Sequence, residues 1–158
     1  MNNGNGGGIL KYRAMVADDY EEAYLLWGNT TGMNLSQADS REEIVRYLER
    51  NPGLSLVCEN EAGKIAGTAM CGHDGRRGYM YHVAVSGECR GAGVGRELVS
   101  RCLGRLREAG IVKCHLMVIE GNELGRSFWS GIGWQERDGI VLFSQDTWSG
   151  GEISEHRP

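Results

Sequence analysis

The chain has 158 residues, of which 41% are hydrophobic and 24% charged, with a formal net charge of −4 at pH 7. These proportions are typical of a soluble globular protein, and the slight acidity argues against a general nucleic-acid binder, which usually carries a basic face. No apolar run is long enough to cross a membrane, and no apolar N-terminal segment resembles a signal peptide. We therefore expect a cytoplasmic protein without nucleic-acid or membrane partners.

The number and spacing of the cysteines predict that they are free thiols. No C-x-x-C pair occurs, and the number of cysteines is odd, so neither a complete disulfide framework nor a zinc site is expected. Most of them stand in apolar segments, where a cysteine behaves as a small hydrophobic residue. Reduced thiols in a cytoplasm, and no metal, are predicted for the five positions: Cys58, Cys71, Cys89, Cys102 and Cys114.

Composition separates one domain from two short ends. Residues 1–8 are rich in Asn and Gly and are predicted to be disordered, and residues 150–158 have the composition of a polar tail. Residues 9–149 show no repeat and no linker, and they are numerous enough to bury a substantial core. A single domain over residues 9–149 is therefore predicted.

Capping and stop signals place two helices after a first strand at residues 10–15. Asp18 is expected to cap a helix over residues 19–27. Ser40-Arg41-Glu42-Glu43 has the spacing of a capping box for a second helix, which Asn51-Pro52-Gly53 ends.

The rest of the chain alternates between strand-like and helix-like patterns. Asp74-Gly75 between two strand-like segments is a typical hairpin signal. Strands are expected at residues 54–59, 65–71, 79–85, 112–119 and 140–144, and helices at residues 96–109 and 123–131. This order predicts an α/β (α+β) fold with a mixed, mostly antiparallel central sheet flanked by helices.

A glycine-rich turn, Arg90 to Gly95, joins a predicted strand to a predicted helix. Its three glycines leave backbone N–H groups uncovered at the positive end of the helix dipole, which favours phosphate binding. Arg90 and Arg96 add cationic charge on either side. The alternatives are an ordinary glycine-rich turn and arginines that are solvated surface charges.

Two nucleotide-binding motifs do not fit this turn. A Walker motif needs Gly-Lys followed by Ser or Thr, but Gly95 is followed by Arg96. A dinucleotide fingerprint needs a third glycine where Arg96 stands, and it opens a parallel sheet rather than following an antiparallel meander.

A third comparison fits, because Arg90-x-x-Gly93-x-Gly95 after a strand resembles the acetyl-CoA-binding motif of the GNAT N-acetyltransferase superfamily. The segment from Asn122 to Trp134 resembles the second motif of this family, an Asn followed by a short helix that ends in an aromatic pair, then Gly and an aromatic residue. Residues 10 to 145 follow the order of elements in the family. The resemblance implies the GNAT acyltransferase fold and acetyl-CoA as cosubstrate.

The resemblance also implies how acetyl-CoA is held. The turn would bind the pyrophosphate, and a strand that splays from its neighbour would pair with the pantetheine arm like an added strand. A backbone N–H of this strand would hold the oxyanion of the tetrahedral intermediate. Core packing explains Val83 and Val85 equally well, and a helix N-cap explains Asn122. The implied cofactor-binding residues are Val83, Ala84, Val85, Arg90, Gly91, Ala92, Gly93, Val94, Gly95, Arg96, Asn122, Ser127 and Trp129.

Two positions depart from the family pattern. The residue that is usually a tyrosine acting as general acid is Trp129 here, and an indole N–H is far too weak an acid. Met117 stands at a strand position where some members carry a Glu that acts as general base. The candidate catalytic residues are therefore His82, because a free imidazole titrates near neutrality, and Glu120. A structural role is the alternative for His82.

Candidate acceptor-binding residues lie in three places. Trp27 ends the first helix, where family members often form the acceptor wall, although core packing explains it as well. Tyr81 stands on the strand beside the expected thioester, and strand alternation puts it on the opposite face from His82. One turn carries several ionisable side chains, among them His73, Arg76 and Arg77. They could bind an acidic group of the acceptor or the phosphate of the cofactor, or they could be solvated surface charges.

Together these features predict an N-acetyltransferase that moves acetyl from acetyl-CoA to a primary amine by direct attack. The acceptor would be a small molecule or a protein amine, and homodimers are common in the family. One alternative is a non-catalytic CoA-binding domain of this fold, which Trp129 and Met117 suggest. Another is a phosphate-binding nucleotide domain unrelated to CoA.

Overall fold

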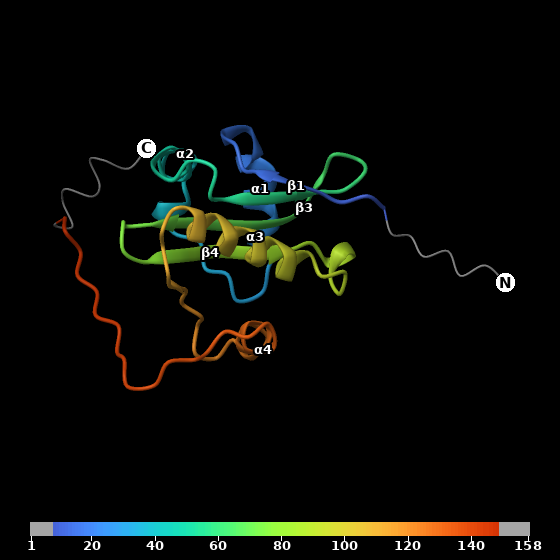
Figure 1. Cartoon of the computed structure of the whole chain (residues 1–158). Helices are drawn as coiled ribbons and strands as arrows, with labels where there is room; N and C mark the ends of the chain where they lie inside the picture. The colour runs from blue at the N-terminus through green and yellow to red at the C-terminus, as the bar shows by residue number, and fades with distance from the viewer. Residues whose placement is uncertain (1–7, 149–158) are drawn as a thin grey trace. The chain divides into compact units, whose positions relative to one another are not determined.

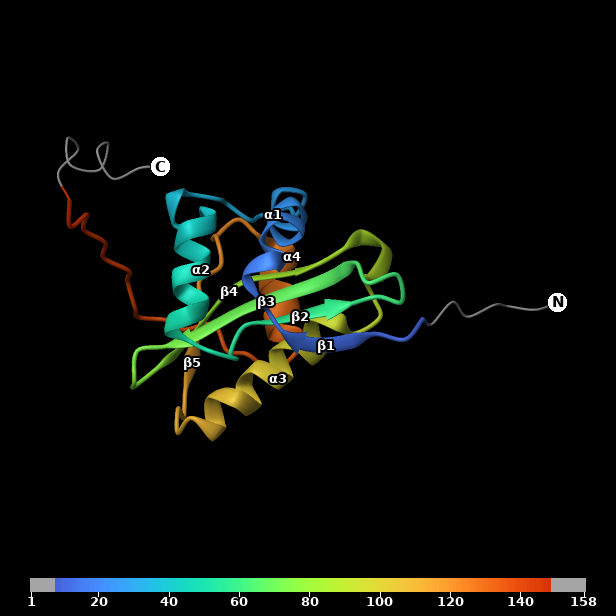
Figure 2. The same cartoon turned by 90° about the horizontal axis from the view of Figure 1, so that it is seen from above.

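A computed structural model describes residues 8–148. Its five strands form one sheet in the order β1-β2-β3-β4-β5 (Figures 1 and 2). Neighbouring strands are antiparallel except β4 and β5, which are parallel, so the predicted mixed, mostly antiparallel sheet is confirmed. The strands are β1 Lys11–Ala14, β2 Leu56–Glu59, β3 Ile65–His73, β4 Gly78–Val85 and β5 Cys114–His115.

The chain divides into two compact units, residues 1–121 and residues 122–158. The first unit contains the sheet, and the described part of the second contains one helix. The segment 1–8, which is predicted to be disordered, and the predicted polar tail 150–158 lie outside the described residues, except for Gly8. The helices are α1 Tyr20–Gly28, α2 Arg41–Arg50, α3 Val94–Glu108 and α4 Glu123–Gly131, with 3-10 turns η1 Ala17–Asp19, η2 Gln37–Asp39 and η3 Gly87–Cys89.

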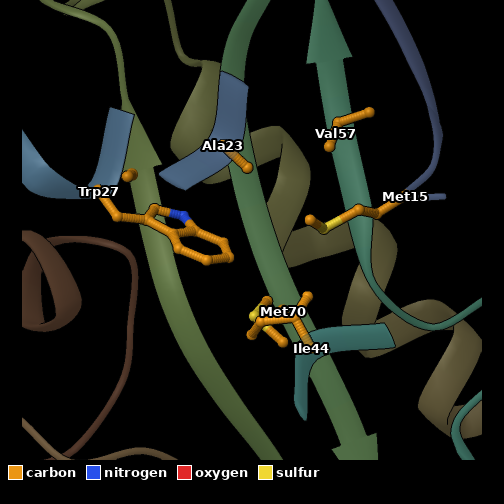
Figure 3. Close-up of a cluster of buried hydrophobic side chains, with 7 residues drawn as sticks. Met15, Ala23, Trp27, Ile44, Val57 and Met70 are labelled. Carbon is orange, nitrogen blue, oxygen red and sulfur yellow. The ribbon is translucent and has the colours of Figure 1, made fainter. Parts of the chain in front are cut away.

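Helices α1 and α2 share one face of the sheet (Figure 2). Their apolar side chains meet those of three strands in a single buried cluster, and the Trp27 ring is its largest member (Figure 3). This cluster consists of Met15, Ala23, Trp27, Ile44, Val57, Met70 and Ala84.

Helix α3 covers the opposite face. A Cβ on Gly67 would lie 2.8 Å from Cγ1 of Val94, while the next residue, Thr68, bonds to Trp27 of α1. Successive strand residues point to opposite faces, so α1 and α3 sandwich β3. At the other end of α3, a Cβ on Gly78 would lie 2.6 Å from Cδ1 of Leu106. Both glycines therefore allow α3 to pack directly on the backbone of the sheet.

Two capping predictions had different outcomes. Ser40 caps α2 as expected, because its Oγ accepts the N–H of Glu43 at 3.4 Å. Asp18 does not cap α1, which follows a 3-10 turn and begins at Tyr20 without a side-chain cap. The neighbouring Asp19 instead binds the Arg13 guanidinium through hydrogen bonds of 2.7 and 2.8 Å.

Two strand predictions in the C-terminal part were wrong in extent or existence. The strand expected at residues 112–119 is only Cys114–His115, because β5 stays beside β4 for two residue pairs and then departs. Residues 140–144 form no strand, since no strand of the described chain pairs with them and the four apolar residues 140–143 are exposed. An apolar segment without a partner makes no ladder.

Candidate active site

The glycine turn at the start of α3 has the conformation that an anion site needs. Gly91 and Gly93 have φ values of +80° and +79°, in the left-handed region that favours glycine. Gly93 is the N-cap of α3, and the helix begins at Val94. The first N–H groups of a helix have no partner within it, so they are directed at the space in front of the turn. Gly91, Ala92 and Gly93 are exposed to that space.

Two exposed arginines flank this turn. Arg90 reaches back to β4, where its Nε donates to the Val85 carbonyl at 3.4 Å. Neither Arg90 nor Arg96 forms an ion pair within residues 8–148. Their positive charges are therefore not neutralised by a carboxylate, and together with the helix dipole they favour an anionic ligand.

An open strand edge leads toward this turn. β4 pairs with β5 only at Gly78 and Tyr79, and beyond Tyr79 no strand of the described chain continues the ladder on that side. The edge comprises Met80 to Val85, and the turn follows within a few residues (Figure 1). An extended ligand can add to such an edge through main-chain hydrogen bonds. Val83 and Val85 are half-buried, and Ala84 is buried in the core cluster.

A bulge interrupts β4 at His82. Thr68 pairs with Ala84 but Met70 pairs with Tyr81, so β4 carries one extra residue at this point. His82 has φ +48° and is the only non-glycine residue with a positive φ in the described chain. Histidine adopts this conformation more readily than most side chains.

The bulge overturns one prediction. Strand alternation puts Tyr81 and His82 on opposite faces, whereas the Tyr81 ring packs edge-on against Tyr47 of α2 and the His82 ring packs on Trp27 of α1. Both side chains therefore face the α1–α2 side of the sheet. Burial, and then the neighbouring Tyr79, raise the pKa of Tyr81, so this half-exposed phenol is neutral at pH 7.

The His82 imidazole is held on several sides by side chains of the first unit. Its Nε2 lies 2.5 Å from Oδ1 of Asp39, and the two side chains are 13% and 10% exposed. The ring stacks on Trp27 with centroids 4.5 Å apart. The His82 carbonyl accepts the Thr68 hydroxyl at 2.8 Å, and Thr68 in turn accepts the Trp27 indole N–H at 2.9 Å.

The other ring nitrogen of His82 is open. Nδ1 has no hydrogen-bond partner within the described residues. The only fully buried side-chain nitrogen or oxygen without a partner in that part of the chain is the Tyr47 hydroxyl, so Nδ1 must be accessible to solvent. In a neutral ring that donates Nε2–H to Asp39, the lone pair lies on Nδ1.

Sequence reasoning did not find Asp39. It lies 43 residues before His82 in the chain, and no local pattern indicates a contact over that distance. The spacing Ser36-x-x-Asp39 is that of a capping box, and both halves of the box form around η2. That signal could have marked Asp39 as a turn residue, but not as the partner of an imidazole.

The predicted acceptor residues fall into two groups, Trp27 and Tyr81 on the α1–α2 side of the sheet and the other three in a hairpin. Trp27 is fully buried in the core, where its ring packs on His82. His73, Arg76 and Arg77 lie in the β3–β4 hairpin, where Asp74 Oδ1 accepts the N–H groups of both arginines at 2.8 Å.

The hairpin and the glycine turn stand at opposite ends of β4 (Figure 1). β4 has eight residues, and with about 3.3 Å between successive residues its ends lie about 23 Å apart. Arg76 and Arg77 therefore lie far from the glycine turn, and their roles toward an acceptor or a phosphate of the cofactor stay predictions.

The second catalytic candidate, Glu120, is exposed and follows β5 by several residues. Met117, at the position where some family members carry a base, is 62% exposed. Neither residue lies in a strand.

Three predicted cofactor-binding residues belong to the second unit. Asn122 is the N-cap of α4, and its Oδ1 accepts the N–H of Gly125 at 3.0 Å, as its alternative role required. Trp129 is half-buried and packs edge-on against Phe128 and Trp134, with centroids 5.0 and 4.9 Å away. Ser127 is exposed on the same helix. Their roles toward a cofactor stay predictions.

The described residues offer few other sites. No helix in residues 8–148 is long and apolar enough to cross a membrane. Nowhere in that range do three or more His, Cys, Asp or Glu side chains gather as a metal site requires. All five cysteines are free thiols.

Comparison with known proteins identifies the family. The model of the acetyltransferase (GNAT) family matches residues 14–134. An acetyltransferase of Sodalis glossinidius is 32% identical over 136 residues, covering 86% of this chain and 94% of the relative. One of Pectobacterium atrosepticum is 33% identical over 133 residues, covering 84% and 93%. The PaiA N-acetyltransferase of Thermoplasma acidophilum, solved in complex with coenzyme A, has a TM-score of 0.71 at 16% identity, covering 84% of this chain and 93% of that one. The chain therefore belongs to the GNAT acetyltransferase family.

Proposed function

We propose that the protein is an acetyl-CoA-dependent N-acetyltransferase that acts on a primary amine of a small molecule or protein. The observation that carries this proposal is the continuity of two features, the open edge of β4 and the glycine turn that begins α3. An extended arm that ends in a phosphate group fits both at once. The acetyl thioester supplies the electrophilic carbonyl carbon, and the chain supplies the remaining groups.

Each part of the site has a role in this proposal. Backbone N–H groups of the turn and the charges of Arg90 and Arg96 bind the pyrophosphate. The edge at Val83 to Val85 pairs with the pantetheine arm. Tyr81, half-exposed on the α1–α2 side, lines the space for the acceptor.

His82 is the proposed general base. An amine attacks only in its neutral form, so a proton must leave the nitrogen before or during attack. As the new C–N bond forms and the C–S bond breaks, the amine proton goes to Nδ1 of His82 and the electron pair of the C–S bond leaves on sulfur. The thiolate is a good leaving group near neutral pH, which fits a chain with Trp129 where relatives carry an acidic tyrosine.

Binding and turnover are tested separately. Acetyl-CoA binding is measured by calorimetry, and release of free CoA is followed with a panel of small amines and peptides. Gly93→Ala is compared with Gly63→Ala, since both positions have a positive φ (+79° and +73°) and open space around an added Cβ. Both variants carry similar backbone strain, but only Gly93→Ala should weaken acetyl-CoA binding, by about tenfold or more, from loss of close phosphate approach.

Each alternative predicts a different result. Tight binding of acetyl-CoA without turnover on any amine would favour a non-catalytic CoA-binding domain, which Trp129 and Met117 suggest. Greater thermal stabilisation by ATP or NAD than by acetyl-CoA would favour a nucleotide-binding domain. Equal binding by the two glycine variants would remove the turn from the site.

A further inference from the structure

We infer that Asp39 is a positioning residue for His82, fixing the proton of the imidazole on Nε2 so that Nδ1 is held ready to take the proton of the amine. This inference rests on the proposed function. It concerns a side chain from the connection between α1 and α2, far in sequence from both family motifs.

Both carboxylate oxygens of Asp39 are committed. Oδ1 contacts Nε2 of His82, and Oδ2 accepts the backbone N–H of Ser36 at 2.8 Å. The Asp39 carbonyl accepts the Tyr20 hydroxyl at 2.7 Å. Because bonds to η2 and α1 fix its backbone and rotamer, the carboxylate presents Oδ1 to the ring in one orientation.

The environment leaves the imidazole one direction for chemistry. Trp27 packs on the ring face, Asp39 takes Nε2, and Thr68 holds the His82 carbonyl. Of the two nitrogens of the His82 ring, only Nδ1 has no hydrogen-bond partner in the described chain. A carboxylate that is 10% exposed is costly to bury without charged or hydrogen-bonding partners. Placing it against Nε2 gives the carboxylate a partner and selects the tautomer.

The backbone gives independent support. His82 adopts φ +48° at the bulge, a conformation that is uncommon outside glycine. Counted from Ala84 in the α1–α2 core cluster, alternation puts His82 on the same face as Asp39, and the extra residue brings Tyr81 to that face as well. Strained residues persist where surrounding structure holds them, and they cluster at functional sites.

Asp39 has a defined part in the proton balance. Before attack it accepts Nε2–H of the neutral ring, which leaves the lone pair on Nδ1. When Nδ1 takes the amine proton, the ring becomes a cation and the carboxylate lies against it. The proton then leaves from Nδ1 to solvent, so this step transfers no proton to Asp39.

A double-mutant cycle tests whether Asp39 acts through His82. The variants are His82→Asn, Asp39→Ala and their combination, and Asn is chosen because it tolerates a positive φ. We expect kcat to fall about 10²- to 10⁴-fold in His82→Asn and about tenfold to a hundredfold in Asp39→Ala, with KM for acetyl-CoA unchanged. The double variant should match His82→Asn, because the effects of residues that act as a unit do not add.

A matched control separates positioning from local folding. Ser36→Ala removes a hydroxyl that accepts the N–H of Ala38 and donates a long, 3.5 Å hydrogen bond to Oδ2 of Asp39, and it keeps the carboxylate and its shorter bond from the Ser36 N–H. It should leave kcat within twofold of the parent. Additive losses in the double variant, or a loss in Ser36→Ala equal to that in Asp39→Ala, would overturn the inference. If Asp39→Ala does not fold, Asp39→Asn replaces it, since the amide oxygen can still accept the Ser36 N–H.

A second readout needs no turnover. Nitrogen-15 NMR of the full chain reports which ring nitrogen of His82 carries the proton when the ring is neutral. The parent should show the proton on Nε2 alone, and Asp39→Ala should show exchange between both tautomers. Identical ring signals in the two proteins would refute the role of Asp39 even if the enzyme is active. A fixed tautomer in a chain that acetylates no amine would instead defeat the proposed function and leave the positioning intact.

Discussion

The two faces of the sheet are filled by different chemistry, although the same strands serve both. On the α3 face, the buried helix residues are aliphatic residues, glycine and cysteine, and two strand glycines let them touch the backbone. On the α1–α2 face, an equally apolar cluster is accompanied by ionisable pairs, Arg13 with Asp19 and His82 with Asp39. In the proposed enzyme, the α3 face supports the fold and the α1–α2 face carries the proposed base, His82.

The largest expected effect on stability comes from the α3 face. Leu98→Ala removes a fully buried side chain of α3 and should lower the free energy of unfolding by about 2–5 kcal/mol, the usual cost of a core cavity. Urea unfolding measures the change. The activity per folded molecule should stay at the parent level, and a selective loss of kcat would contradict the division between the faces. Leu25→Ala, at a side chain that is 66% exposed, is the control.

An ion pair on the other face provides the next test. Burial disfavours the charged form of Asp19, but hydrogen bonds from Arg13 and from the Val16 N–H outweigh it and lower the pKa of this carboxyl. Asp19→Asn should therefore cost about 1.5–3 kcal/mol of stability at pH 7.

The pH dependence of that loss follows from the sign of the shift. A carboxyl whose folded pKa lies below its ordinary value of 3.8 adds stability above that pH and loses it as the pH falls through the folded value. The gap between parent and Asp19→Asn should thus be constant near neutrality and narrow below pH 3.8. Asp18→Asn, at an exposed neighbour, should show no such gap. A gap that persists undiminished in acid would show that Asp19 is not ionised in the fold.

The close approach of α3 to the sheet predicts a smaller loss of stability on adding a methyl group at Gly67. The matched control, at another glycine, should gain stability. An added Cβ on Gly67 meets side chains of Val94 and Leu98 at 2.8 and 3.1 Å and the Ala84 carbonyl at 3.2 Å. Gly67→Ala should cost about 1–3 kcal/mol through overpacking. Gly104→Ala, on α3 with nothing within 4 Å of an added Cβ, should gain about 0.5–1 kcal/mol from helix propensity. If the two variants have melting temperatures that are lowered by the same amount, crowding at Gly67 is not the cause of its loss.

The smallest expected change in stability carries the most functional information. Thr68→Val keeps the side-chain shape but removes the hydroxyl between the Trp27 indole and the His82 carbonyl. The loss should be about 1 kcal/mol, yet kcat should fall because the bulge that carries His82 loses one restraint. Ser55→Ala, which removes a buried hydroxyl bonded to the backbone of Cys71 on β3, is the control and should change stability only. Equal kcat in the two variants would place Thr68 among purely structural residues.

Local signals predicted the parts of this molecule that local interactions determine. Asn122 marks the start of α4, and the helix runs from Glu123 to Gly131 as expected. Ser40 and the sequence Asn51-Pro52-Gly53 bound α2 in the same way. The glycine turn was recognisable because its two glycines with positive φ, Gly91 and Gly93, stand directly before the start of α3 in the sequence.

Features that depend on pairing between distant segments were not predictable. The bulge at His82 is a property of the β3–β4 register, which one strand's own sequence does not reveal. The Asp39 contact joins segments 43 residues apart. Residues 140–144 have strand-like composition, but composition does not supply the neighbour that a strand requires. The missed part of the site is thus the part built by tertiary contact.

The short pairing of β4 with β5 has a consequence for the behaviour of the protein in solution. Beyond Tyr79, an apolar strand presents one edge that no strand in the described chain completes. Such an edge is a template for another copy of the same chain, and proteins usually protect it with charge or cover. A ligand lying along Met80 to Val85 would occupy those backbone groups. If coenzyme A binds along this edge as proposed, light scattering of concentrated samples should rise more slowly with coenzyme A present than without it.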